Sequence, residues 1–345
     1  MNFGLQDLAH SLFGALDADK FSNPLNFSSS ERVAFLLVDG LGADALEKYK
    51  SEAPTLAALT QLPILSTTFP STTATALATL GTGEFPGAHG MLGYTVRVPR
   101  SGEPGRLLNA LKWDERVDPL IWQSVPTLFE RASAEGISTS QISAKRYEGT
   151  GFTRAALRGA NYVGANLISE ISDEAAKVLR KEKSFAYVYI NHLDVAGHED
   201  GAGSEKWLLA LATVAKLLTE LKEKLPPGTR VWVTADHGMV NADEIIIFGK
   251  DNDLDKDVTL YGGEPRARHL YVRDGAARDV ISRYRNYLGT KAEVLSKDEA
   301  ISNNLFGNQM SIDSEERIGD IIVIANGGLI LVDPERVKEE AGMVG

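Results

Sequence analysis

Residues 33–40 read VAFLLVDG, six consecutive apolar side chains followed directly by Asp39 and Gly40. A short apolar run that ends at a turn residue is typical of a strand that is covered on both faces, as in a parallel sheet. FAYVYI (185–190) and VWVT (231–234) repeat this pattern, and longer amphipathic stretches separate the three runs. The alternation predicts an α/β fold with a mostly parallel central sheet and helices on both of its faces.

Three helical patterns support this architecture. They cover TATALATL (73–80), PTLFERASAEG (126–136) and the long periodic stretch EKWLLALATVAKLLTELKEKL (205–225). Near the end, GDIIVIANGGLILVD (319–333) predicts two short strands joined as a hairpin at Asn326-Gly327-Gly328. We expect a single catalytic domain over residues 1–345. Residues at about 91–161 and 241–268, which fit the alternation poorly, are interpreted as insertions that cap the carboxyl ends of the strands.

The composition excludes several classes of protein. With 36 basic and 47 acidic residues the formal net charge is −11, whereas a protein that binds a nucleic-acid duplex normally has the opposite sign. Small phosphorylated ligands stay possible if a few cations or metal ions gather them locally. The chain has no cysteine, which excludes disulfides, thiolate metal sites and cysteine nucleophiles.

The sequence also predicts where the protein resides. Residues 1–20 lack the basic segment and apolar run of a signal peptide, so a cytoplasmic location is expected. No apolar run reaches the roughly 18 to 20 residues that cross a bilayer, so no membrane association is expected. The oligomeric state is left open.

Acidic and histidine side chains follow each of the three apolar runs. Asp39 follows the first, Asp194 and His198 come shortly after the second, and Asp236 and His237 follow the third. Ligands of open α/β sheets bind beyond the carboxyl ends of the strands, which is where these residues fall. His269, which opens the strand-like HLYV, adds a further imidazole.

Each of these residues also has an ordinary structural interpretation. Asp39 alone would be a helix cap or turn residue, and Asp194 with His198 would be a surface ion pair. Their convergence favours a metal site. A site of imidazole and carboxylate ligands is typical of zinc, and manganese and iron also bind such sites.

A hydroxyl-rich loop enters the Ala-rich helical stretch in STTFPSTTATALATLGTGEFPGAHG (66–90). The free amide groups at such a helix start attract anions, so the segment is a candidate phosphate cradle. An ordinary Ser/Thr helix cap is the alternative. The segment contains neither a Walker motif nor a G-x-S-x-G elbow.

Taken in order, these motifs resemble the type I phosphodiesterase and nucleotide pyrophosphatase family of the alkaline phosphatase superfamily. The matching residues are Val38-Asp39-Gly40, Thr68-Phe69-Pro70, Gly81 to Gly90, Asp194 to His198, Asp236-His237-Gly238 and His269. The resemblance spans most of the chain.

The resemblance implies a site with two divalent metal ions, Zn²⁺ first and Mn²⁺ as an alternative. One ion would be held by Asp39, Asp236, His237 and the Thr68 hydroxyl, and the other by Asp194, His198 and His269. Thr68 would be the nucleophile, attack phosphorus in line and form a phosphothreonine intermediate that water hydrolyses.

One position departs from the family pattern. Nucleotide pyrophosphatases of the family place Asn directly after Phe-Pro, and here that position is Ser71. Ser71 is therefore a candidate phosphoryl contact of altered geometry. Cationic and aromatic side chains in the first insertion are further candidate substrate contacts: Tyr94, Lys112, Trp113 and Arg146.

These expectations describe a hydrolase of phosphodiester or phosphoanhydride bonds in small molecules, with nucleotides as the leading substrates. A phosphonoacetate hydrolase or phosphomonoesterase of the same superfamily is the enzymatic alternative. A non-catalytic protein that binds metal or a nucleotide is the alternative from another class.

Overall fold

The computed structural model describes residues 3–340. Its strands are β1 (Arg32–Val38), β2 (Thr95–Val98), β3 (Arg106–Asn109), β4 (Ser138–Ser143), β5 (Asn161–Gly164), β6 (Ser184–Ile190), β7 (Thr229–Thr234), β8 (Glu244–Ile247), β9 (Val258–Glu264), β10 (Ala267–Val272), β11 (Ala292–Ser296), β12 (Ile321–Ala325) and β13 (Leu329–Val332).

The α-helices are α1 (Leu5–Gly14), α2 (Ala43–Lys48), α3 (Pro54–Ala57), α4 (Thr73–Thr82), α5 (Pro86–His89), α6 (Pro119–Trp122), α7 (Leu128–Ala134), α8 (Gly151–Ala156), α9 (Ile168–Val178), α10 (His192–Asp200), α11 (Glu205–Lys224), α12 (Ala277–Leu288), α13 (Lys297–Ser302), α14 (Ile312–Arg317) and α15 (Val337–Glu340). Single 3₁₀ turns cover Lys50–Glu52, Lys145–Tyr147 and Gly289–Lys291.

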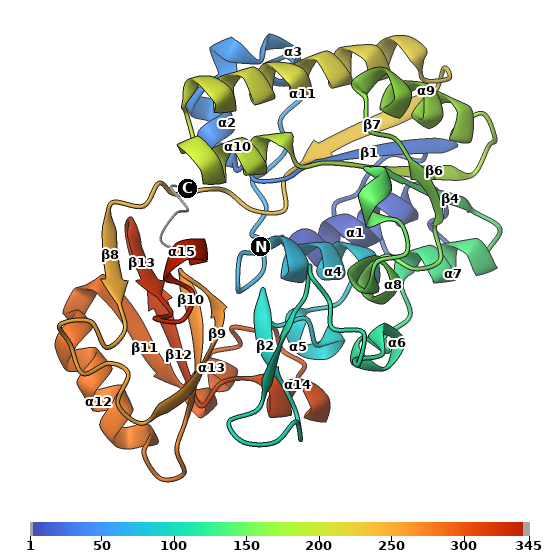
Figure 1. Cartoon of the computed structure of the whole chain (residues 1–345). Coiled ribbons are helices and arrows are strands. Elements are labelled where there is room, and N and C mark those ends of the chain that lie inside the picture. The colour runs from blue at the N-terminus through green and yellow to red at the C-terminus, as the bar shows by residue number, and fades with distance from the viewer. Residues whose placement is uncertain (1–2, 341–345) are drawn as a thin grey trace.

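The central sheet has five parallel strands in the order β5-β4-β6-β1-β7. Helices lie on both of its faces, with α9, α10 and α11 on one and α1, α4 and α7 on the other (Figure 1). The predicted α/β class is therefore confirmed. The three apolar runs form β1, β6 and β7, which are neighbours in the sheet. β1 and β6 are buried on both faces, whereas β7 lies at the edge and is only partly buried.

The alternation along β1 shows how the sheet buries both faces. Val33, Phe35 and Leu37 pack with α1 and α4, whereas Ala34 and Leu36 pack with α9 and α11. All of these side chains are at most 2% exposed, so the run could not lie on a half-exposed strand.

The predicted helices are present with shifted ends. TATALATL extends through Thr82 as α4, which ends at Gly83 in the left-handed conformation. The stretch 126–136 contains α7, whose capping box pairs the Thr127 hydroxyl with the Glu130 backbone amide. The long periodic stretch is α11, and its buried residues include Trp207, Leu211 and Leu218.

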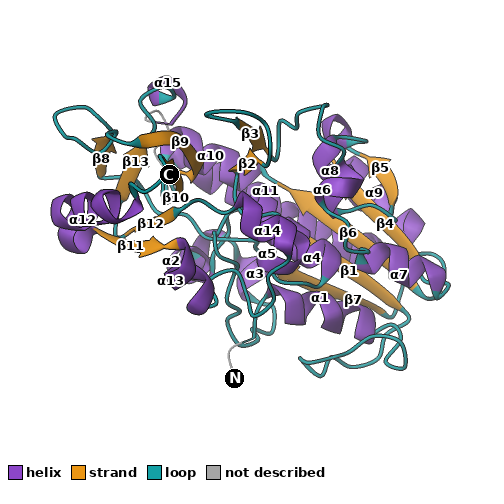
Figure 2. Ribbon diagram, turned by 90° about the horizontal axis from the view of Figure 1, so that it is seen from below, coloured by secondary structure: helices purple, strands orange, loops and turns teal. Residues whose placement is uncertain are grey.

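A second, antiparallel sheet has the order β11-β12-β10-β9 and lies apart from the first in both views (Figures 1 and 2). Ile321 and Val323 of β12 pack against α12, whereas Ile322 and Leu295 join the core beneath the five-stranded sheet. One face of the small sheet therefore shares a hydrophobic core with the large one.

The hairpin predicted over 319–333 is wrong. β12 and β13 both exist, but β12 pairs with β10 and β11, and β13 pairs in parallel with β8. A strand has two edges, and both edges of β12 are already occupied. The Asn326 to Gly328 turn still reverses the chain, since the Leu329 amide donates to the Asn326 carbonyl.

The expected insertions contain strands of the sheets themselves. Residues 91–161 supply β4 and the first residue of β5 to the five-stranded sheet, and only the β2–β3 hairpin stands outside it. Residues 241–268 supply β8, β9 and the start of β10 to the smaller sheets. The strand β4 lacks a continuous apolar run, because buried Thr139, Ser140 and Gln141 occupy its centre.

Within residues 3–340, the helices that the structure describes are each too short or too polar to cross a membrane.

Candidate metal centre and phosphoryl-transfer site

Three loops meet at the carboxyl edge of the central sheet because β6, β1 and β7 are neighbours. The Asp39 amide donates to the Ile190 carbonyl at 3.0 Å, which joins the loop after β1 to the end of β6. The Gly40 amide donates to Asp236 Oδ1 at 3.1 Å, which joins it to the loop after β7. Gly42 and Gly238 also approach closely, since a Cβ on Gly42 would lie 2.6 Å from the Gly238 Cα.

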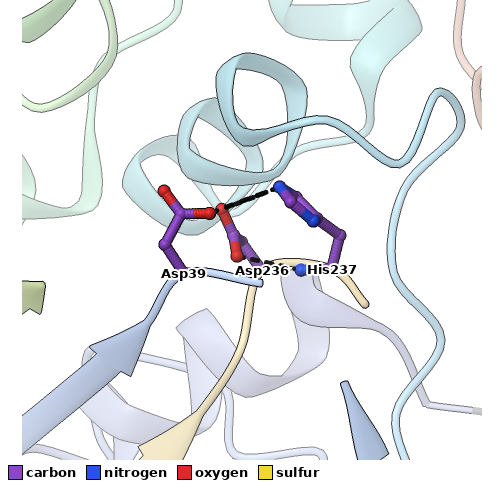
Figure 3. Close-up of side chains that lie close together, drawn as sticks. All are labelled: Asp39, Asp236 and His237. Atoms are coloured by element: carbon purple, nitrogen blue, oxygen red, sulfur yellow. Dashed lines mark hydrogen bonds and ion pairs between the residues drawn. The ribbon is translucent and has the colours of Figure 1, made fainter. Parts of the chain in front are cut away.

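Asp39, Asp236 and His237 form a compact cluster at this edge (Figure 3). One ligand atom from each lies within 4.8 Å of the others. His237 Nε2 is 3.3 Å from Asp39 Oδ1 and 3.6 Å from Asp236 Oδ2. Because His237 Nδ1 lies 3.0 Å from the Gly238 carbonyl, which only accepts, the neutral ring carries its proton on Nδ1 and presents the Nε2 lone pair to the carboxylates.

The cluster is electrostatically unfavourable without a cation. Asp39 and Asp236 are at most 1% exposed. Burial raises the pKa of Asp39 well above its ordinary value, and the Asp236 and Asp194 carboxylates raise it further. Burial and Asp194 also raise the pKa of Asp236, whose Oδ2 has no hydrogen-bond partner among the described residues. Converging lone pairs around a buried, orphaned carboxylate oxygen fit a divalent cation such as zinc.

Asp194 and His198 form a second pair beside this cluster. They lie on successive turns of α10, and His198 Nε2 is 3.3 Å from Asp194 Oδ1. The backbone of Asp194 packs against Gly40, where a Cβ would meet the Asp194 Cα at 3.3 Å. The structure therefore places Asp194 at the same edge of the sheet as Asp39.

His269 lies in β10 and is fully buried. Its Nδ1 accepts a hydrogen bond from the Gly319 amide at 3.1 Å, and burial lowers its pKa to about 4. Its Nε2 is buried and has no hydrogen-bond partner among the described residues. Within residues 3–340, Asp194, His198 and His269 do not form a group of ligand atoms comparable with the first cluster.

Hydroxyl groups from the loop before α4 and from the first residue of α4 lie near the first cluster. Thr67 Oγ1 donates to the Asp236 carbonyl, and Thr68 Oγ1 donates to the Pro70 carbonyl at 3.0 Å. Thr73 Oγ1 lies 3.1 Å from His237 Nε2 and 3.4 Å from Asp39 Oδ1. In this conformation Thr73, rather than Thr68, contacts side chains of the cluster, and sequence reasoning did not single it out.

Tyr189 and Glu264 are two further residues at the site that the sequence did not reveal. The Tyr189 hydroxyl donates to Asp39 Oδ2, although the residue sits inside an apolar strand run. Glu264 accepts from the Tyr94 amide at 3.1 Å, and burial raises its pKa to about 7. Their only sequence signal is a polar atom close to the end of an otherwise apolar strand.

The candidate substrate contacts are scattered. Ser71 is exposed before α4, and Tyr94 is partly buried beside Glu264. Lys112 forms an ion pair with Glu339 at 2.8 Å, and Trp113 Nε1 donates to the Val117 carbonyl at 2.9 Å. The remaining candidate, Arg146, lines an open pocket at the carboxyl ends of β4, β5 and β6.

The chain matches the family model described as type I phosphodiesterase / nucleotide pyrophosphatase over residues 33–345. It is 22% identical over 248 residues to an uncharacterized pyrophosphatase/phosphodiesterase of Schizosaccharomyces pombe, which covers 67% of this chain and 49% of that relative. The chain thus spans about half the length of the curated relative it matches.

Two solved structures show a similar fold. Murine ectonucleotide pyrophosphatase / phosphodiesterase 5, an inactive threonine-to-alanine variant in complex with AMP, aligns with a TM-score of 0.69 and 16% identity over 91% of this chain and 83% of that one. Phosphonoacetate hydrolase from Sinorhizobium meliloti, in complex with phosphonoformate, aligns with a TM-score of 0.65 and 18% identity over 89% and 84%.

The family model covers residues 33–345 and therefore most of the chain. The chain belongs to the type I phosphodiesterase / nucleotide pyrophosphatase family of hydrolases.

Proposed function

We propose that this protein hydrolyses phosphodiester or phosphoanhydride bonds of small molecules, with nucleotides as the leading substrates, through a threonine nucleophile. The observation that carries the proposal is the buried cluster of Asp39, Asp236 and His237, which lies beside a hydroxyl-rich loop. Family membership and the AMP complex of the murine structural neighbour support the substrate class.

Asp39, Asp236 and His237 would hold one divalent cation, Zn²⁺ or Mn²⁺, and Asp194 with His198 would contribute to a second. Bound cations would supply Lewis-acid charge that favours a deprotonated hydroxyl and offsets the negative phosphoryl oxygens. His269 stays the proposed third ligand of the second site, because its buried Nε2 has no hydrogen-bond partner among the described residues.

Thr68 is the proposed nucleophile. Its hydroxyl is held by the Pro70 carbonyl, and the adjacent Thr67 hydroxyl anchors the loop to the Asp236 backbone. The Thr68 oxygen forms a bond to phosphorus while the bond to the leaving oxygen breaks; the hydroxyl proton passes to solvent and the leaving oxygen takes a proton from solvent. Water then cleaves the phosphothreonine and restores the hydroxyl. The inactive threonine-to-alanine variant of the murine neighbour supports a threonine in this role.

The direct test is hydrolysis of an aryl ester of thymidine 5′-phosphate by the zinc- or manganese-loaded protein. Thr68→Ala should abolish turnover and retain bound metal. Thr72→Ala is a matched control, since the Thr72 side chain makes no cap hydrogen bond to α4 and should be dispensable. Full activity of Thr68→Ala would reject the covalent mechanism, and ligand binding by the parent protein without turnover of any phosphorylated compound would favour a non-catalytic binding protein.

A phosphonoacetate hydrolase is the second candidate, because the Sinorhizobium meliloti enzyme aligns over most of both chains. Rates on a diester, a monoester and phosphonoacetate, measured side by side, separate these activities. A phosphonoacetate rate above the diester rate would favour the second candidate.

A further inference from the structure

A pocket of about 480 Å³ opens at the carboxyl ends of β4, β5 and β6, and Tyr189 of its lining contacts the cluster of Asp39, Asp236 and His237. Tyr189 belongs to both features, since its ring lines the pocket and its hydroxyl donates to Asp39 Oδ2. Tyr147, from the 3₁₀ turn after β4, faces it with the two ring centroids 6.1 Å apart. The pocket and the cluster are therefore separated by the Tyr189 side chain.

The charge of the pocket is opposite to that of its surroundings. Arg146 is a permanent cation in the lining, and the described lining residues include no Asp or Glu. His192 also lines the pocket, and partial desolvation together with the nearby Arg146 guanidinium lowers its pKa. The chain has a net charge of −11, and three aspartates lie close to the pocket. The positive charge of Arg146, with no Asp or Glu among the described lining residues, reverses the sign of the charge locally.

Arg146, Asn191 and Tyr147 place hydrogen-bond donors in the pocket. The Tyr147 hydroxyl oxygen accepts from Arg146 Nη2 at 2.9 Å and from Asn191 Nδ2 at 3.0 Å. A phenol oxygen that accepts twice keeps its own proton to donate elsewhere. Arg146 likewise retains further N–H groups, because one guanidinium carries five.

Ser143 also lines the pocket and is fully buried, and its hydroxyl forms a side-chain hydrogen bond with Tyr162. Glu170, an acidic residue beside the pocket, already accepts hydrogen bonds from the backbone amides of Asn166 and Leu167.

We propose that this pocket binds a second anionic group of the substrate, a phosphate or a carboxylate, together with the organic part that carries it. The proposal rests on the proposed function, because it assigns the transferred phosphoryl group to the metal cluster. Arg146 would pair with the anion, the Tyr147 hydroxyl would donate to it, and the apolar lining, which includes Ile171 and Val195, would contact the organic part. Substrates with two anionic groups would then be preferred over those with one.

The test uses two matched pairs of probes and measures binding by calorimetry to metal-loaded Thr68→Ala protein. ADP differs from AMP by one phosphate, and phosphonoacetate differs from ethylphosphonate by a carboxylate in place of a methyl group. At least one pair should show about tenfold or greater preference for the more anionic member, as expected for a charged hydrogen-bonded contact. The pair that does so identifies the anion as phosphate or carboxylate.

Substitutions then assign the preference to the pocket. Arg146→Gln should reduce it by about tenfold, and Tyr147→Phe, which keeps the ring, should reduce it less. Arg154→Gln, an exposed arginine on α8 outside the pocket lining, is the matched control and should retain it. Absence of preference in both pairs, or its survival in both pocket variants, would overturn the proposal. Preference without turnover of any substrate by the protein with Thr68 intact would instead reject the proposed function and leave the pocket assignment standing.

Discussion

The hydroxyl of Tyr189 donates to Oδ2 of Asp39, so a residue of the pocket wall holds the first carboxylate of the metal cluster. This bond occupies one carboxylate oxygen and leaves Oδ1 facing His237. Partners of this kind orient ligands and tune metal affinity. The candidate metal centre and the pocket are therefore connected through one strand residue.

Tyr189→Phe should weaken metal binding by about tenfold, because Asp39 Oδ2 loses its donor while the ring that lines the pocket remains. Zinc titration with a competing chelator measures the change. Tyr187→Phe on the same strand is the matched control, since the buried Tyr187 hydroxyl has no hydrogen-bond partner among the described residues. Equal zinc affinity in the two variants would show that the bond to Asp39 does not orient the ligand.

Thr73→Val should also weaken metal binding, by about threefold to tenfold, since it removes the hydroxyl that contacts Asp39 and His237 at nearly constant volume. Thr72→Val, one residue earlier, should leave the affinity unchanged. Comparison of Thr73→Val with Thr68→Ala also tests which threonine is the nucleophile. Loss of turnover in Thr73→Val with retained turnover in Thr68→Ala would assign that role to Thr73.

Glu264→Gln should change how stability depends on pH. The folded-state pKa of Glu264 is about 7, whereas an unfolded Glu titrates near 4.3. Between these values the folded chain holds the proton that the unfolded chain has lost, so the free energy of unfolding falls as pH rises and levels off above about 7. Glu264→Gln has no carboxyl group to titrate and so does not lose stability in this way. Its free energy of unfolding relative to the parent should therefore rise by about 2 kcal/mol between pH 5 and pH 8.

Urea denaturation of the metal-free proteins at pH 5 and 8 measures this difference. Glu299→Gln is the control, because hydrogen bonds from Ser296 lower the pKa of Glu299 and place its titration below this window. A constant difference between Glu264→Gln and the parent across the window would contradict the burial of a protonated carboxyl at this site.

Gly42→Ala should destabilise the protein by about 1 to 3 kcal/mol, because the new methyl group would press on the Gly238 backbone. Metal affinity should fall with it, since Gly238 follows His237. Gly238→Ala offers a matched comparison: its Cβ would lie an ordinary 3.4 Å from the Gly42 Cα. Thermal unfolding and zinc titration measure these effects in both variants. Equal losses of stability and zinc affinity would show that the close approach of Gly42 to Gly238 does not cause them.

Much of the fold was predictable because its signals are local. A run such as VAFLLV is apolar at every position, so it identifies a strand buried on both faces without reference to its neighbours. Because Asp39 and Asp236 come at the ends of such runs, the sequence also predicted their position at the carboxyl edge of a parallel sheet. The strand β4 was harder to recognise as part of that sheet, because its centre is polar although buried.

The features that were predicted wrongly, or not predicted, depend on contacts between residues far apart in the chain. The turn at Gly327 was recognised, but the partners of β12 and β13 were decided by which sheet edges were already occupied. The contact of Thr73 with His237 joins residues 164 positions apart. Local periodicity carries no information about such contacts.

The sequence by itself determined the α/β class, the three strands that carry the acidic loops and the order of the family motifs, since hydrophobic burial acts on each short run independently. Only the tertiary structure decided the Tyr189 bond to Asp39, the burial of His269 beside the Gly319 amide and the pocket around Arg146. These features arise where separate strand ends converge, and their geometry depends on how the whole chain packs.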